Sequence, residues 1–245
     1  MLKKSPRLVI TLPVFKDSEF LECALKELDN ATRSIVNDYI FVIAEDGSDS
    51  SKMISELKTK YPNVVHLQSG ERLGKGRALR ESWGKVDGDI YLFADVDLAT
   101  DLNKLDAYRN LIESQKEYDL VTGSRYLPES TCERPPLRKL ASLAYNWLVR
   151  LLFRTGVRDH QCGFKSLSKK LVERLLVESR SDSWFWDTEA FVLARKFGFR
   201  IHEIPVYWVE VQAHRTSLKR LMSDALLFGS GLLKLLKRTY FTLGT

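Results

Sequence analysis

The feature that most constrains the fold is the alternation of short apolar segments with amphipathic segments through the first half of the chain. Segment 19–30 places Leu21, Ala24, Leu25 and Leu28 on one face at helical spacing. Strands that alternate with helices form a mainly parallel sheet covered by helices on both faces, so we predict an α/β fold. The expected strands are 7–14, 39–44, 64–67, 90–94 and 120–122, and the expected helices are 19–30, 50–60, 75–86 and 101–113.

The second half of the chain has a different character. Segment 126–136 is polar, contains three prolines and lacks periodicity, which predicts a loop at the active site. We interpret residues 1–215 as one domain and residues 216–245 as a C-terminal extension that contains an amphipathic helix. The further elements that we expect are helices at 137–153, 169–178, 188–197 and 217–238, and a strand at 200–206.

Two carboxylates follow the apolar run that ends at Ala94, in the pattern Asp95-Val96-Asp97. Ligands of parallel sheets bind beyond the carboxyl ends of the strands. Like charges at such a place repel each other unless a cation lies between them, and hard oxygen ligands suit Mg²⁺ or Mn²⁺. The pattern therefore indicates a metal that bridges to a diphosphate. The alternative is a strand-end turn in which Asp95 caps the next helix and Asp97 is solvated.

Composition narrows the range of partners. The net charge of +6 and the pI of about 9.1 favour anionic partners, but the basic residues are dispersed and no recognition helix stands out, so we expect no nucleic-acid binding. Cys23, Cys132 and Cys162 lack metal-site spacing and are odd in number, which favours a reducing compartment. The start of the chain has the pattern of a first strand, and we expect neither a signal peptide nor a transmembrane helix.

An ordered set of motifs resembles the family 2 glycosyltransferases, and within them the dolichyl-phosphate glucose and mannose synthases. Segment 159–165, Asp-His-Gln-Cys-Gly-Phe-Lys, is the sharpest marker, and the resemblance covers residues 7–225. It implies a GT-A fold with a Rossmann-like nucleotide-binding half, a nucleotide-sugar donor, a divalent Mg or Mn ion and a lipid-phosphate acceptor. The other motifs are 12–17, 44–48, 72–78, 95–97, 123–126, 186–189 and 203–208.

The resemblance also implies roles for individual residues. Asp95 and Asp97 would hold the metal, and the catalytic group would comprise Asp97, Asp187 and Arg125. Other readings stay open at this point: Asp46 belongs to a turn, Asp187 caps a helix, and the arginines form surface ion pairs. The donor-binding positions are Pro13, Val14, Asp17, Glu45, Asp46, Gly74, Lys75 and Asp95, and the acceptor-phosphate positions are Arg125, Arg138, Ser142, Arg215 and Ser217.

The implied reaction is the inverting transfer of a hexose from UDP-glucose or GDP-mannose to dolichyl or polyprenyl phosphate. Glucose is favoured because the mannosyl type tends to have Gln two residues after the second Asp, where this chain has Ala99. A phosphate acceptor is already ionised near neutral pH, so it needs no strong general base. The alternatives are a transferase of the same fold that acts on a soluble or glycan acceptor, and a catalytically silent nucleotide-sugar binding protein.

The C-terminal segment carries leucines and phenylalanine interspersed with lysine and arginine, a pattern that suits a helix lying in an anionic membrane interface. Segment 137–153 has a similar character. We therefore expect a peripheral protein on the cytoplasmic face of a membrane. The alternative is that both helices pack on the core or on a partner chain, and the sequence predicts no oligomeric state.

Overall fold

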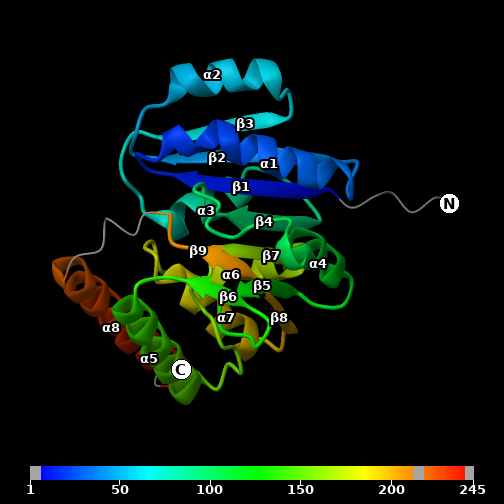
Figure 1. Ribbon diagram of the computed structural model, residues 1–245. Coiled ribbons are helices and arrows are strands. Elements are labelled where there is room, and N and C mark those ends of the chain that lie inside the picture. Colours follow the sequence, from blue (N-terminus) through cyan, green and yellow to red (C-terminus); the bar gives the residue numbers. More distant parts are fainter. Residues whose placement is uncertain (1–6, 212–217, 241–245) are drawn as a thin grey trace.

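The computed structural model describes residues 7–211 and 218–240. Within the first range, seven strands form one sheet in the order β3–β2–β1–β4–β7–β5–β8, and two further strands, β6 and β9, pair with each other (Figure 1). The strands are β1 (Leu8–Val14), β2 (Tyr39–Asp46), β3 (Val64–Ser69), β4 (Ile90–Ala94), β5 (Leu120–Ser124), β6 (Thr131–Glu133), β7 (Phe164–Ser168), β8 (Ile201–Pro205) and β9 (Tyr207–Val209).

Helices cover both faces of the sheet, as the alternation predicted. Along β1, Leu8 and Ile10 join the core beneath α1 and α4, whereas Val9 joins the core beneath α3, α6 and α7. This period of two is that of a strand buried on both faces. The α-helices are α1 (Leu21–Arg33), α2 (Ser51–Lys60), α3 (Lys75–Trp83), α4 (Ala107–Glu113), α5 (Pro136–Phe153), α6 (Lys169–Glu178), α7 (Trp186–Lys196) and α8 (Leu218–Tyr240).

The sheet is mixed at one place that the sequence pattern did not predict. Strand β7 lies between β4 and β5 and runs antiparallel to both, whereas the other pairs in this sheet are parallel. Its sequence, Phe-Lys-Ser-Leu-Ser, has polar residues in a fully covered strand and therefore lacks the apolar run expected of one. The insertion brings segment 159–165 to the end of β4 where the two acidic residues lie.

Two expected elements differ from the structure in their bounds. The helix expected at 101–113 begins at Ala107, because Leu105 and Asp106 adopt positive φ angles of 57° and 50° and break the helical path. The segment expected to be a loop at 126–136 contains β6, which pairs in parallel with β9. This second ladder ties the segment to the chain that follows β8.

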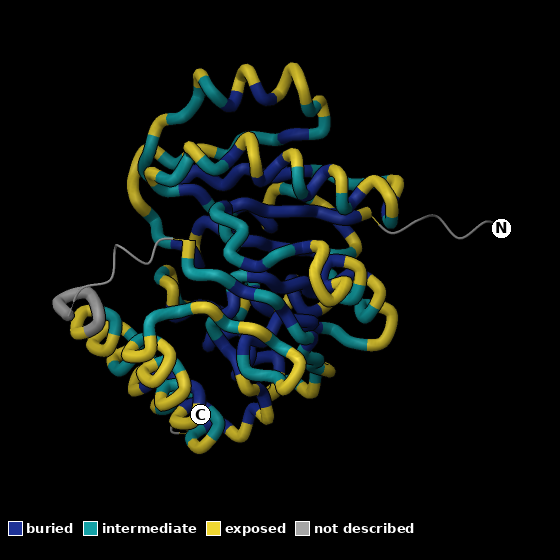
Figure 2. Tube along the Cα trace, viewed as in Figure 1, coloured by how far each residue is buried: buried dark blue, intermediate teal, exposed yellow. Residues whose placement is uncertain are grey.

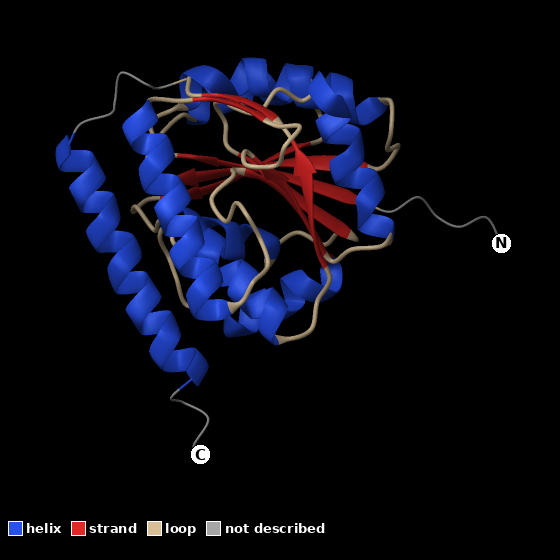
Figure 3. Cartoon of the chain, turned by 60° about the horizontal axis from the view of Figure 1, so that its bottom comes forward, coloured by secondary structure: helices blue, strands red, loops and turns tan. Residues whose placement is uncertain are grey.

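Helices α5 and α8 lie side by side at the edge of the molecule, away from the sheet (Figures 1 and 3). They share a small core in which Phe153 of α5 meets Leu232 and Leu235 of α8, and Phe185 completes it from the turn before α7. Long stretches of both helices stay exposed (Figure 2). None of the helices in the described residues is both long and apolar enough to cross a membrane.

Candidate active site

The two acidic residues of the Asp-x-Asp pattern lie at the carboxyl end of β4. The Asp95 carboxylate accepts a hydrogen bond from Lys75 Nζ at 2.9 Å, and the Asp95 amide donates to the Gly163 carbonyl at 2.9 Å. A Cβ atom on Gly163 would lie 1.7 Å from Asp95 Oδ2, so only glycine permits this approach. The missing side chain of Gly163 therefore leaves room for the carboxylate of Asp95, which the sequence predicts to bind the donor.

Asp97 lies beside Asp95 and is mostly buried. Burial, together with the negative charges of Asp95 and Asp17, raises the pKa of Asp97 to about 6. Such mutual repulsion would be relieved by a divalent cation, and carboxylate oxygens are ligands that Mg²⁺ and Mn²⁺ accept. In the described residues, no group of three or more His, Cys, Asp or Glu side chains is arranged so that it could hold a metal ion.

A buried chain of alternating charges continues from Asp95 into the protein. Lys75 Nζ lies 3.3 Å from Asp187 Oδ2, and Lys165 Nζ lies 2.7 Å from Asp187 Oδ1. Burial disfavours the charged form of Lys75, but the carboxylates of Asp187 and Asp95 outweigh it and raise its pKa. Phe185, not Asp187, is the N-cap of α7, so the capping alternative for Asp187 is wrong. Asp187 instead positions the two lysines.

The residues predicted to bind the nucleotide lie at the ends of β1 and β2. Pro13 and Val14 pair with Ala44 and Glu45. Glu45 is buried, and it accepts from Ser48 and meets His66 Nε2 at 2.8 Å. Each oxygen of the Glu45 carboxylate therefore has a protein partner at the carboxyl end of β2.

Asp46 has a local structural role. Its carboxylate accepts backbone hydrogen bonds from Leu73 and, at 2.9 Å, from Gly74. Gly74 has a φ of 92°, and a Cβ there would lie 2.4 Å from the Asp182 carbonyl. Asp46 thereby shapes the turn that starts α3 and delivers Lys75, instead of capping the helix that follows Ser50.

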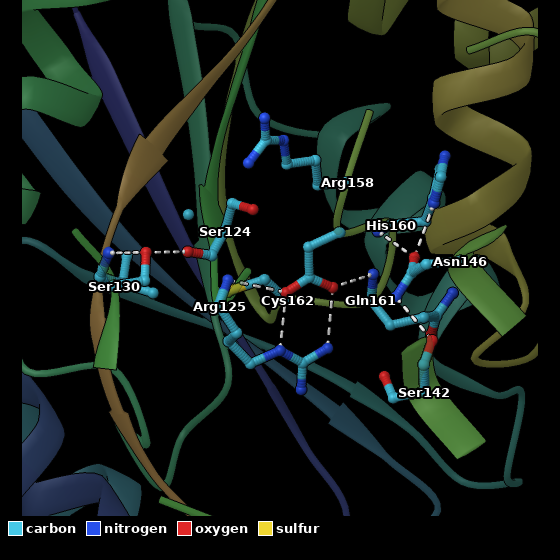
Figure 4. Close-up of polar contacts among 12 residues, drawn as sticks. Ser124, Arg125, Ser130, Ser142, Asn146, Arg158, His160, Gln161 and Cys162 are labelled. Atoms are coloured by element: carbon cyan, nitrogen blue, oxygen red, sulfur yellow. Dashed lines mark hydrogen bonds and ion pairs between the residues drawn. The ribbon is translucent and has the colours of Figure 1, made fainter. Parts of the chain in front are cut away.

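Arg125 and Asp159 form a buried bidentate ion pair, and dashed lines in Figure 4 mark its contacts at the labelled Arg125. The Arg125 Nε and Nη2 atoms lie 2.7 and 2.8 Å from the two carboxylate oxygens, and the Arg125 amide donates to the same group at 3.0 Å. Burial alone would raise the pKa of Asp159, but Arg125 overrides it and lowers the value to about 2. The surface ion-pair alternative is wrong for Arg125, because both side chains are buried.

Side chains of α5 contact segment 159–165 directly, through Asn146, and indirectly, through Thr188. Asn146 Oδ1 accepts from the His160 amide at 2.9 Å and from His160 Nδ1 at 2.7 Å (Figure 4). The other ring nitrogen, Nε2, lies 2.8 Å from the Thr155 hydroxyl. Thr188, next to Asp187, connects the two segments, because its hydroxyl lies 2.7 Å from Gln161 Nε2 and 2.6 Å from the Tyr145 hydroxyl. The orientation of α5 is therefore coupled to the buried site.

The predicted acceptor-phosphate residues do not all converge. Arg138, in the first turn of α5, pairs with Glu210, and Ser142 lies one turn further along the helix, partly exposed. Arg125 lies deeper, in its pair with Asp159. Arg215 and Ser217 lie outside the described residues.

Some residues of the site carried no sequence signal that singled them out. Lys165 was quoted in segment 159–165 without a role, yet it is buried and holds Asp187. Asn146 lay in an apolar helix pattern, where one polar residue on the buried face is a signal that it has a partner. Arg134 and Glu210 lay in segments without periodicity, and only their pairing in the fold makes them evident.

Comparison with known proteins agrees with this geometry. Residues 10–177 match the model of Glycosyl transferase family 2. Glycosyltransferase AglD of Haloferax volcanii is 36% identical over 229 residues, which are 92% of this chain and 36% of AglD, so the chain spans little more than a third of that relative. Dolichyl-phosphate beta-glucosyltransferase ALG5A of Trichomonas vaginalis is 29% identical to this chain, and the match covers 89% of this chain and 70% of the length of ALG5A.

A solved structure with the same fold is glucosyl-3-phosphoglycerate synthase from Mycobacterium tuberculosis in complex with Mn²⁺, UDP and phosphoglyceric acid. Its TM-score is 0.68 at 17% identity, over 94% of this chain and 78% of that one. This likeness confirms the predicted GT-A type of α/β fold. Because the family model covers more than half of the sequence, the chain belongs to glycosyl transferase family 2.

Proposed function

We propose that this protein transfers a hexose, with glucose favoured over mannose, from a nucleotide diphosphate sugar to the phosphate of dolichol or another polyprenol. UDP-glucose is the favoured donor. This choice is supported by the similarity of the chain to two dolichyl-phosphate beta-glucosyltransferases, ALG5A of Trichomonas vaginalis and a relative in Dictyostelium discoideum. Mn²⁺ or Mg²⁺ is the proposed cofactor, and Asp95 and Asp97 are its proposed ligands.

One juxtaposition carries the proposal. The loop after Asp97 is hydrogen-bonded to β9, through Val209 N to Ala99 O at 2.9 Å and Asp101 N to Tyr207 O at 2.9 Å. The residue after β9 is Glu210, which pairs with Arg138 of α5. The two carboxylates suited to a donor's metal are therefore linked, through this loop and β9, to Arg138. Arg138 is a cation suited to a phosphate, and it lies at the start of a helix with exposed apolar side chains.

The chemistry follows from charge and position. A bound metal would neutralise charge on the leaving diphosphate. The phosphate acceptor arrives ionised, so the protein needs to align it with the anomeric carbon and hold the surrounding charges in place. Lys75 and Lys165 fix both oxygens of Asp187, which suits a group that positions the sugar. We propose a single displacement that inverts the anomeric carbon.

The proposed function is tested by incubating the protein with labelled UDP-glucose or GDP-mannose, dolichyl phosphate and Mn²⁺. We expect label in the lipid phase, more from UDP-glucose, as a β-linked sugar phosphate. An α-linked product or a covalent sugar–enzyme adduct would exclude the single displacement. Donor binding without any lipid product would favour the soluble-acceptor transferase or the silent binding protein.

We further propose that α5 and α8 rest on an anionic membrane surface. Leu140 and Trp147 of α5 are 65% and 58% exposed, and Leu226 of α8 is 74% exposed. Lys139 and Lys234 lie exposed on the same two helices. Apolar side chains flanked by cations suit the boundary between head groups and acyl chains. The three cysteines are free thiols, which favours the cytoplasmic face.

Vesicle sedimentation tests this surface. We expect the protein to bind phosphatidylglycerol-containing vesicles more strongly than neutral ones, and less strongly at high salt. The double variant Leu140→Glu/Leu226→Glu should lose binding, because each change places a charge in the interface. Val177→Glu is the control, since Val177 is 64% exposed and belongs to α6, not to either of these helices. Equal binding by the double variant and the control would contradict the proposal.

A further inference from the structure

Arg134 and Arg138 hold one carboxylate between them. Arg134 Nε lies 3.0 Å from Glu210 Oε2, and Arg138 Nη1 contacts Glu210 Oε1. The three side chains are only 10%, 14% and 12% exposed, so this is a shielded cluster. Two arginines around one anion form the arrangement that proteins use to bind phosphate.

The fold places this cluster beside the donor side of the site. The Glu210 amide donates to the Glu133 carbonyl at 2.9 Å, which sets Glu210 opposite Arg134 at the end of the β6–β9 ladder. Val209, one residue earlier, is bonded to Ala99 in the loop that follows Asp97. Arg134 is therefore connected through β9 to the loop that follows Asp97, although the sequence assigned it no role.

The surroundings of Glu210 are strongly positive. The guanidinium carbons of Arg125 and Arg134 lie 5.1 and 4.9 Å from the ring centre of Trp208, so both stack on the same buried side chain. The first turn of α5 contains no acidic residue, and Pro135 provides no side-chain cap. The positive end of the helix dipole adds to the charge of the arginines. Arg125 has Asp159 as its counterion, and Glu210 is the shared counterion of Arg134 and Arg138.

We propose that Arg134 binds the acceptor's phosphate together with Arg138, and that Glu210 occupies the phosphate position until the acceptor arrives. This inference rests on the proposed function, because it takes the ligand to be an isoprenyl phosphate monoester. Such a group carries more negative charge than a carboxylate and offers three acceptor oxygens. It therefore displaces Glu210 from the two arginines, and the carboxylate turns outward as the acceptor enters.

A purely structural ion pair and an exchangeable one predict different effects of Glu210 neutralisation on the affinity for phosphate. If Glu210 only supports the fold, its neutralisation lowers the stability of the protein and leaves the affinity for phosphate equal or lower. If Glu210 competes with the acceptor, its neutralisation removes the competitor and tightens phosphate binding. Removal of Arg134 weakens phosphate binding under the exchange proposal alone, because a structural partner does not contact the ligand.

The first experiment titrates the protein with citronellyl phosphate, a short soluble isoprenyl phosphate, and with inorganic phosphate. We expect Arg134→Ala to weaken citronellyl phosphate binding about tenfold or more, with donor affinity changed less than twofold. Arg134→Lys should fold as the wild type does and still bind several times more weakly, because it lacks the guanidinium fork. Arg109→Ala is the matched control, since Arg109 forms an exposed pair with Glu113 on α4. Unchanged affinity in both Arg134 variants overturns the inference.

The second experiment uses Glu210→Gln, with thermal melting to verify that it folds. We expect citronellyl phosphate to bind at least about threefold more tightly than to the wild type, while inorganic phosphate binds more weakly than citronellyl phosphate to both. Equal or weaker binding by Glu210→Gln overturns the exchange. Transfer to dolichyl phosphate is measured separately: wild-type transfer with no effect of Arg134→Ala refutes only this inference, and no wild-type transfer refutes the proposed function.

Discussion

Asp97→Asn is expected to reduce sugar transfer about a thousandfold or more, the equivalent of about 4 kcal/mol of transition-state stabilisation. Asp97 is one of two carboxylates placed to hold a divalent ion, and the amide that replaces it carries no charge. The same variant should lose the rise in melting temperature that Mn²⁺ and UDP-glucose together give the wild type, which reports binding without turnover. Both readouts are measured at pH 7.5 over a range of Mn²⁺ concentrations.

The fold itself should survive this change. Asp97 is largely buried beside Asp95, so a neutral amide relieves repulsion, and the melting temperature without metal should equal or exceed that of the wild type. Asp87→Asn is the control, because Asp87 forms an exposed pair with Lys169. Transfer within tenfold of the wild type, or an undiminished response to Mn²⁺, would refute the metal role of Asp97.

The second large effect is a loss of stability in mild acid caused by His160. Burial lowers the pKa of His160 to about 3, because the ring is enclosed and fully bonded as a neutral imidazole between Asn146 and Thr155. In the unfolded chain the ring takes up a proton near its ordinary pKa of about 6.5. The free energy of unfolding should therefore fall by about 2 kcal/mol between pH 7.5 and pH 5 through this residue alone.

The direction follows from the two protonation states. The folded pKa lies below the unfolded one, so the contribution is complete above about pH 6.5 and declines as the pH falls toward 3. Urea unfolding at pH 7.5, 6 and 5 measures it. His160→Asn, whose amide can still reach Asn146, should start less stable but lose about 2 kcal/mol less over this range. His202→Gln is the control, a partly exposed ring stacked on Tyr118. Identical pH slopes in wild type and His160→Asn would contradict the prediction.

Local patterns predicted most elements because their signals lie within a few residues. The apolar run of β4 and the apolar helix that became α5 were both recognisable from short windows of sequence. Strand β7 was not, since its burial depends on partners rather than on its own composition. Lys165 is accommodated inside that strand because its ammonium lies 2.7 Å from the carboxylate of Asp187, which comes from α7, and also donates to the Cys162 carbonyl.

The candidate site shows the same division. The carboxylates at the end of β4 and the glycine of segment 159–165 were indicated by motifs, and the fold brings Asp95 and Gly163 into direct contact. The counterion of each arginine was not indicated. Arg125, which the sequence predicts to bind an acceptor phosphate, has a buried partner in Asp159, and Arg138 shares Glu210 with Arg134.

By itself, the sequence determined the α/β layering, the family and the strand end that carries the two acidic residues, because hydrophobic period and short motifs are properties of neighbouring residues. Only the tertiary structure decided where β7 enters the sheet and which cation meets which carboxylate. Those choices join segments tens of residues apart, such as Lys75 with Asp187 and Arg134 with Glu210. Charge pairing at such separations depends on the order of strands in the sheet, and no local pattern encodes that order.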